Sequence, residues 1–216
     1  MINLIKKDIL IQKKMFPLLC VFIIIFALNS QVNSRGSIYI LGVTIGYMLT
    51  IGALAYDETY KGHILINSLP LTRKNVVVSK YLAIFFFTAF SLIFLTLMAL
   101  IFNFLGISDL SIKYISFADI KTITSTVIIL SSIMIPLFLK FGTKLGKLFN
   151  FIIFFMFFSI SNFIMQNKDE RLIKNILNFI INNNGATLTI ISIIILACIY
   201  ILSMHFSFKI YSNKDF

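Results

Sequence analysis

The residues best suited to chemistry in this sequence lie in the polar segment 57–80, between two long apolar runs. Asp57 and Glu58 open the segment, where acidic side chains favour the positive end of a helix dipole. Lys61 follows Asp57 by four residues, a spacing that lets the two side chains pair along one helix face. The pattern predicts a short helix that begins at this point.

The same segment carries an apolar set at helical spacing, formed by Ile64, Leu65 and Leu69. Pro70 ends this helix, because proline cannot continue the backbone hydrogen bonds. Thr72 is a good N-cap for a second helix, which we expect to start at Arg73 and to continue into the next apolar run. A stiff amphipathic helix with charged ends is more than a connection requires, so the segment favours docking against a cytosolic partner.

Residue types that bind metals or act as nucleophiles are sparse. His63 and His205 are too far from other ligands to predict a metal site, and we interpret both as surface or interface residues. Cys20 and Cys198 fall inside apolar runs, which favours small buried side chains over a disulfide framework or zinc spacing. We therefore predict no catalytic, cofactor-binding or metal-binding residue in this chain.

The elements that hold segment 57–80 are predicted to be membrane helices. Of the 216 residues, 59% are hydrophobic and 12% are charged, whereas a soluble domain is near 45–50% and 25%. This excludes a soluble domain and a disordered chain. The sequence predicts a single all-α membrane domain over 1–216, with six spans at 15–29, 38–56, 81–105, 122–139, 148–165 and 187–206.

The distribution of charge predicts the orientation of the chain. Segment 1–14 alternates isoleucines with lysines and is expected to form an amphipathic helix on the inner membrane surface. With both termini in the cytoplasm of a multi-pass protein of the cell membrane, 13 Lys and Arg lie inside and 6 outside. The net charge of +11 therefore indicates contact with the anionic lipid bilayer, not with nucleic acid.

The six predicted spans contain no Asp, Glu, Lys or Arg. This argues against a proton-driven carrier, a voltage-gated channel and an intramembrane protease, all of which need ionisable groups in the membrane. Gly42 and Gly46 form a G-x-x-x-G motif, which predicts close helix packing. In the outer segment 166–186, apolar residues recur on one helix face, which predicts an interfacial helix.

One run of residues resembles a known family. Glu58…Lys61…Ser68-Leu69-Pro70-x-Thr72-Arg73…Val77…Lys80-Tyr81 is similar to the signature of small bacterial type-2 ABC transporter permeases, which share the ABCG-like fold. That group includes exporters of amphipathic peptide toxins and of antimicrobial peptides. The resemblance implies a permease that pairs with a second permease chain, as a homodimer or heterodimer, and docks cytosolic ATPase subunits.

The resemblance also assigns roles to residues. Segment 57–70 would be the coupling helix, with Asp57, Glu58, Lys61, Ile64, Leu65, Leu69, Pro70 and Arg73 as the ATPase-coupling residues. This chain has no Walker A motif, so ATP and magnesium would be bound by the partner ATPase, and this chain would not be an enzyme. In ABCG-like transporters an outer helix at the position of 166–186 caps the exit.

The resemblance further implies that the second and fifth spans of two chains enclose the transport path. The candidate path residues are Thr44, Tyr47, Phe155, Phe158, Ser159 and Asn162. An uncharged, Phe-rich path suits an amphipathic or hydrophobic substrate such as a peptide, a lipid or a drug. We therefore expect the permease subunit of an ATP-driven exporter.

Two other functions stay open on the sequence. A six-span substrate-binding subunit of an energy-coupling-factor importer would also recruit an ATPase, but it should have a buried polar ligand cradle and lack a capped helix at 57–70. A non-transport membrane scaffold would need no ATPase, so co-purification of an ATP-binding subunit would discriminate it.

Overall fold

The computed structural model describes residues 2–15, 17, 19–21, 35–59, 72–104, 115–166 and 186–213, and in these ranges it contains helices and no strand. A short helix, α1 (Ile2–Ile11), and a 3-10 turn, η1 (Gln12–Met15), precede four long helices. These are α3 (Arg35–Thr59), α5 (Arg73–Phe104), α6 (Phe117–Gln166) and α8 (Ala186–Ser212). The prediction of an all-helical chain is confirmed for the described residues.

Four helical stretches among the described residues are long and apolar enough to cross a membrane: Ile38–Asp57, Arg73–Ile101, Phe117–Gly142 and Thr189–Ser212. They correspond to the predicted second, third, fourth and sixth spans. The predicted fifth span lies in the helical second half of α6. Most of the predicted first span, 15–29, and residues 167–185 of the predicted outer helix fall outside the described residues.

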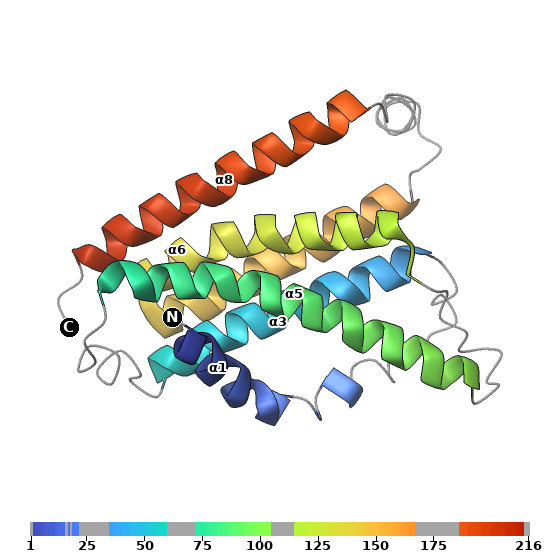
Figure 1. Ribbon diagram of the computed structural model, residues 1–216, viewed down its shortest axis with the longest axis horizontal. Helices are drawn as coiled ribbons and strands as arrows, with labels where there is room; N and C mark the ends of the chain where they lie inside the picture. Colours follow the sequence, from blue (N-terminus) through green and yellow to red (C-terminus); the bar gives the residue numbers. More distant parts are fainter. Residues whose placement is uncertain are drawn as a thin grey trace.

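Helix α3 is the central element of the bundle (Figure 1). In the apolar 18-residue stretch of α3 that could lie in the membrane, 83% of the residues are buried within the chain. In the corresponding stretch of α8 none is buried. One face of α3 packs on α5 and α6 through Val43, Tyr47 and Ile51, and another packs on α5 through Leu41, Ile45 and Leu49. Because α3 is apolar on both faces, it can be enclosed on both sides.

The predicted G-x-x-x-G motif brings α3 close to its neighbours within the chain. A Cβ atom on Gly42 would lie 2.6 Å from Ile123 Cδ1 of α6, and one on Gly46 would lie 3.2 Å from Ser91 Oγ of α5. The close packing predicted from these glycines is confirmed. However, both glycines are used inside one chain and are therefore not available to a second chain.

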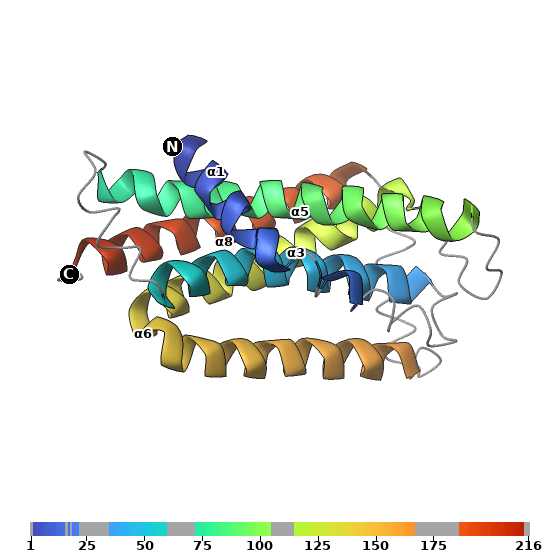
Figure 2. The same ribbon diagram turned by 90° about the horizontal axis from the view of Figure 1, so that it is seen from below.

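Helix α6 reverses direction at Gly142. This glycine has φ 73°, a left-handed backbone conformation that residues with a Cβ rarely adopt, and it separates two helical segments. Figure 2 shows the two segments running antiparallel, with the turn at the same end of the bundle as α1. A Cβ on Gly146 would lie 2.8 Å from the Phe138 ring, so the segments meet closely just beyond the turn. The connection predicted over 140–147 is thus much tighter than a loop.

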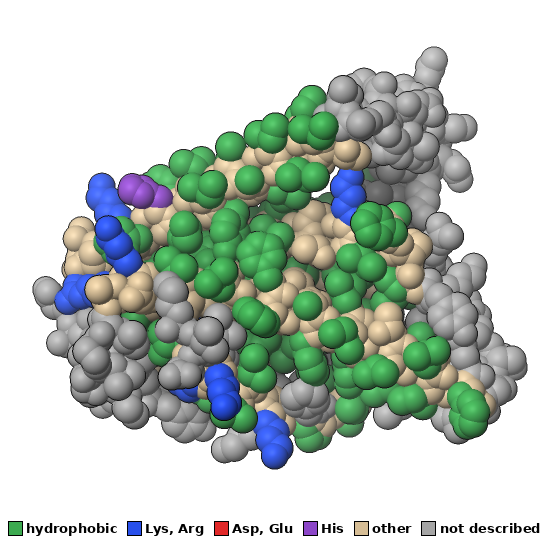
Figure 3. All heavy atoms as spheres, viewed as in Figure 1, with side chains coloured by type: hydrophobic (Ala, Val, Ile, Leu, Met, Phe, Trp, Pro, Cys, Tyr) green, Lys and Arg blue, Asp and Glu red, His purple; other side chains and the backbone are tan. Residues whose placement is uncertain are grey.

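Basic side chains gather at one end of the bundle. In Figure 3 the Lys and Arg side chains (blue) cluster around α1 and the joined ends of α5 and α8, with one at the opposite end. The described basic residues at the clustered end belong to α1, the start of α5, the α6 turn and the end of α8: Lys6, Lys7, Arg73, Lys74, Lys80, Lys140, Lys144, Lys147 and Lys209. We refer to this as the basic end.

Candidate functional site

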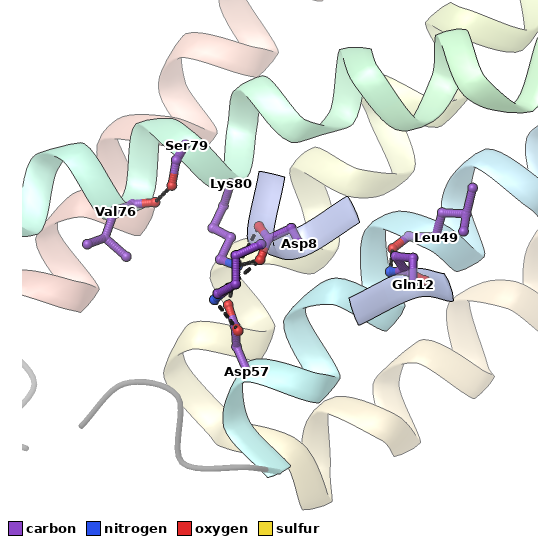
Figure 4. Close-up of polar contacts among 8 residues, drawn as sticks. Asp8, Gln12, Leu49, Asp57, Val76, Ser79 and Lys80 are labelled. Carbon is purple, nitrogen blue, oxygen red and sulfur yellow. Dashed lines mark hydrogen bonds and ion pairs between the residues drawn. The ribbon is translucent and has the colours of Figure 1, made fainter. Parts of the chain in front are cut away.

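Four charged side chains from three helices meet at the basic end, where α3 ends and α5 begins. Lys7 and Asp8 come from α1, Asp57 comes from the last turn of α3, and Lys80 comes from the third turn of α5. Asp8, Asp57 and Lys80 are labelled in Figure 4. We call these four residues the ion cluster. They hold together elements that are far apart in the sequence.

Lys80 is the centre of the ion cluster. Its ammonium lies 2.8 and 3.0 Å from the two carboxylate oxygens of Asp8, and it also donates to Asp57 Oδ2. Lys7 donates to the other Asp57 oxygen at 2.5 Å and lies 3.4 Å from Asp8 Oδ1. Each carboxylate therefore contacts both ammonium groups, and the formal charges cancel.

The ion cluster is largely removed from solvent. The Asp8 side chain is 0% exposed, Lys80 9%, Asp57 13% and Lys7 33%. Burying a charge costs several kcal/mol unless it is paired, and removing one partner of a buried pair typically costs about 3–5 kcal/mol. The cluster thus fixes α1 against both helices that flank segment 60–71, and loss of any one member leaves an unbalanced charge.

Neighbouring contacts reinforce the same junction. Gln12 Nε2 donates to the Leu49 carbonyl of α3 at 2.5 Å, which ties η1 to α3 in addition to the contact between α1 and α3. Lys80 is followed by Tyr81, whose hydroxyl lies 2.6 Å from Ser203 Oγ and 2.7 Å from Ser207 Oγ of α8. Consecutive residues of α5 therefore bind α1 and α3 on one side and α8 on the other.

The structure places the predicted coupling residues as follows. Asp57 lies in the last turn of α3, not at the start of a new helix, because α3 continues to Thr59. Its partners are Lys7 and Lys80, whereas the predicted partner Lys61 lies outside the described residues. The side chain of Glu58 and the residues Ile64, Leu65, Leu69 and Pro70 also lie outside them.

The second half of the predicted segment behaves as expected. Thr72 Oγ1 accepts a hydrogen bond from the Asn75 amide at 3.3 Å, so the predicted N-cap of α5 is confirmed. Arg73 begins α5 and donates to the Ser212 carbonyl at the end of α8. The start of α5 is therefore joined to the last turn of α8 at the basic end.

The candidate path residues do not form one surface in the chain. Thr44 is fully buried and donates to the Ile40 carbonyl, and the buried Tyr47 hydroxyl donates to Asn150 Oδ1 at 2.7 Å. The second half of α6 covers Tyr47, whose ring stacks on Phe154. Within one chain Thr44 and Tyr47 are therefore buried, Tyr47 beneath the second half of α6, and their place on a path between two chains stays a prediction.

Two other candidate path residues, Phe155 and Ser159, lie on the exposed face of the second half of α6. Phe155 is 63% exposed and Ser159 is also exposed, while the side chains of Phe158 and Asn162 lie outside the described residues. Phe151 and Phe163 extend the same exposed face. Phe149, Phe154 and Phe157 pack inward, so the rings of this helix divide into a packing face and a free face.

Sequence reasoning missed three members of the ion cluster: Lys7, Asp8 and Lys80. The predicted third span begins at residue 81, whereas the candidate span in α5 begins at Arg73 and therefore includes Lys80. One signal was present. Asp8 is the first acidic residue of the chain and the only one before Asp57, and it lies among the four lysines of segment 6–14.

No metal-binding group was found among the described residues, where no three His, Cys, Asp or Glu side chains come together. The ion cluster holds two carboxylates already satisfied by ammonium groups, which leaves no ligand set for a cation. The arrangement ties α1 to the end of α3 and to the third turn of α5.

Comparisons with known proteins identify the family of the chain. A family model described as ABC-2 family transporter protein matches residues 3–212, which is nearly the whole chain. A search of curated proteins and a search of solved structures found no match. With its apolar spans and this match over nearly its full length, the chain is a membrane-embedded permease component that belongs to the ABC-2 family of transporters.

Proposed function

We propose that this chain is the permease subunit of an ATP-driven exporter, with six spans, both termini in the cytoplasm and α1 at the inner surface of the cell membrane. ATP and magnesium would be bound by a separate cytosolic ATPase. A second permease chain would complete the transport path, and the substrate would be amphipathic or hydrophobic. Outward transport and the ATPase are proposals that rest on the family and on the resemblance of segment 57–80.

The observation that carries the proposal is the ion cluster. It fixes α1 to the two helices that flank segment 60–71, at the end of the bundle where basic residues gather. Basic residues favour the cytoplasmic side, so this is the side from which an ATPase would approach. Because the helices on both sides of segment 60–71 are fixed to α1, movement of an ATPase bound to the segment would be transmitted to the membrane spans.

The test is to reconstitute the chain with its ATPase and to compare two substitutions in the coupling segment with a matched control. Leu65→Asp and Lys61→Glu should reduce ATPase co-purification by more than tenfold, because a charge placed in a docking face costs several kcal/mol. Lys144→Glu changes an exposed lysine on the α6 turn of the same basic end and should leave co-purification intact.

Transport is measured in vesicles with a fluorescent amphipathic peptide as the probe. Peptide movement away from the ATPase side that requires ATP supports the exporter. Movement toward the ATPase side would indicate an importer, and a wild-type chain that captures no ATPase would indicate a scaffold. If Leu65→Asp and Lys61→Glu both co-purify the ATPase as the wild type does, segment 57–70 is not the docking element.

A further inference from the structure

An apolar groove runs along the membrane face of the bundle between α8, α5 and the first segment of α6. It has a volume of about 540 Å³, and its walls include Phe85, Ile128, Ile193, Ala197 and Tyr200. Figure 1 shows why it opens: α8 meets α5 at the basic end and diverges from the other helices toward its own start. Figure 3 shows hydrophobic side chains covering the area between α8 and the helices below it.

The spacing of small and large residues on α8 accounts for this divergence. Ser203 and Ser207 are buried and hydrogen-bonded to Tyr81, so small side chains allow α8 to approach α5 closely there. Earlier in α8 the chain carries a run of isoleucines, of which Ile190, Ile193 and Ile194 remain more than half exposed. The helix is therefore held at one end and leaves a groove at the other.

Among the described residues that line the groove, one carries a positive charge, and it lies at the far end. Lys121 lines it, one turn after Phe117, which is 86% exposed at the start of α6. Asp119 is already engaged, because its Oδ2 accepts hydrogen bonds from the backbone amide and the hydroxyl of Ser116, each at 2.9 Å. Among the described residues no carboxylate pairs with Lys121. A lysine at the end of a span extends toward the lipid headgroups.

We propose that this groove binds an anionic phospholipid from the leaflet at the end opposite the basic end. One acyl chain would lie along Ile128, Ile193 and Tyr200, and the headgroup phosphate would contact Lys121. The argument is charge complementarity at the mouth of an almost wholly apolar groove. A second protein helix of apolar residues would bury the Lys121 ammonium without a partner, whereas a phosphate neutralises it.

The experiment uses the absence of tryptophan from this chain. Ile193→Trp places a fluorescent reporter on the groove wall, and Ile195→Trp places one on the other side of the same helix at a similar depth. The two isoleucines are exposed to a similar degree, 58% and 54%. The full-length variants are reconstituted into vesicles that contain phosphatidylglycerol or phosphatidylcholine brominated on the acyl chains, at the same mole fraction.

Quenching at position 193 should show about a fivefold preference for phosphatidylglycerol, the factor that corresponds to ~1 kcal/mol for one lysine near anionic lipid. Lys121→Gln should abolish the preference, and Lys121→Arg should retain it. Quenching of the tryptophan at position 195 should show no preference between the two lipids, whether residue 121 is Lys, Gln or Arg. Equal quenching of position 193 by the two lipids, or a preference that survives Lys121→Gln, would overturn the proposal.

A third result would also overturn it: weak quenching of position 193 by both lipids would mean that protein, not lipid, covers the groove. Because the indole itself occupies part of the groove, native mass spectrometry of the chain without tryptophan gives an independent measurement. The wild-type chain should retain phosphatidylglycerol after transfer to detergent, and the Lys121→Gln variant should lose it. Equal retention by the two chains contradicts the assignment of Lys121. Because neither measurement involves an ATPase, failure here leaves the exporter proposal intact.

Discussion

The Lys80 ammonium lies 2.8 and 3.0 Å from the two carboxylate oxygens of Asp8, a residue 72 positions earlier in the chain. This contact links the N-terminal helix to the third turn of α5 in a region where both side chains are buried. It also brings α1 beside Asp57, at the end of α3, so that one lysine joins three helices.

Loss of one acidic member should destabilise the protein strongly. Asp8→Asn leaves two lysines facing the single carboxylate of Asp57, and we expect a loss of about 3–5 kcal/mol in the free energy of unfolding. Asp8→Leu combined with Lys80→Met removes a balanced pair and should recover most of that loss. Thermal unfolding in detergent measures both variants.

The control for this prediction is Lys6→Met, at an exposed position of α1, which should change the free energy of unfolding by less than about 0.5 kcal/mol. A melting temperature for Asp8→Asn equal to that of the wild type would contradict the role of the cluster.

The close approach of α3 and α6 depends on Gly42. Adding a methyl group there meets Ile123 Cδ1 at 2.6 Å, so Gly42→Ala should destabilise the chain by about 1–3 kcal/mol through overpacking. Ile123→Val removes the Cδ1 atom, and the double variant should be more stable than Gly42→Ala alone. The comparison of the two melting temperatures checks this. If Gly42→Ala weakened assembly between chains without changing the unfolding of one chain, the glycines would serve a contact between chains instead.

The hydroxyl of Tyr81 should matter more than that of Ser207, one of the two serines it contacts. Tyr81→Phe leaves Ser207 without this partner and breaks the tie between α5 and α8, which should cost about 1–2 kcal/mol. Ser207→Ala keeps the contact between Tyr81 and Ser203, so it should cost less. Hydrogen exchange of the α8 amides, together with thermal unfolding, ranks the two variants. The reverse order would show that Ser207 has a role of its own in packing α8.

The exposed face of α6 predicts where a second chain makes contact. In a background with Cys20 and Cys198 replaced by serine, single cysteines at Phe151, Phe155 and Phe163 should cross-link between two chains. Cysteines at the inward positions Ile153 and Phe154 should not, because they pack against the core of their own chain. Cross-linking along α8 with none along α6 would move the interface to α8 and remove Phe155 from the proposed path.

Much of the architecture follows from the sequence alone. The apolar runs require helices in a membrane, because the bilayer offers no partner for free backbone groups. Thr72 predicts the N-cap of α5, and the Gly42 and Gly46 spacing predicts a close helix contact; both are confirmed. Each of these signals is local, since it depends on residues within one or two helical turns. The family signature in 57–81 is local in the same sense.

Only the tertiary structure shows which partners these residues choose. Asp57 has Lys61 four residues away in the sequence, yet its carboxylate binds Lys7 and Lys80, because the fold brings α1 and α5 to the end of α3. Likewise, the reversal of α6 at Gly142 lays its second segment over Tyr47, a contact that no local pattern in the sequence indicates. A helical period assigns residues to faces of one helix. Which face meets which neighbour depends on how the helices pack around α3, and that is decided by contacts between residues far apart in the chain.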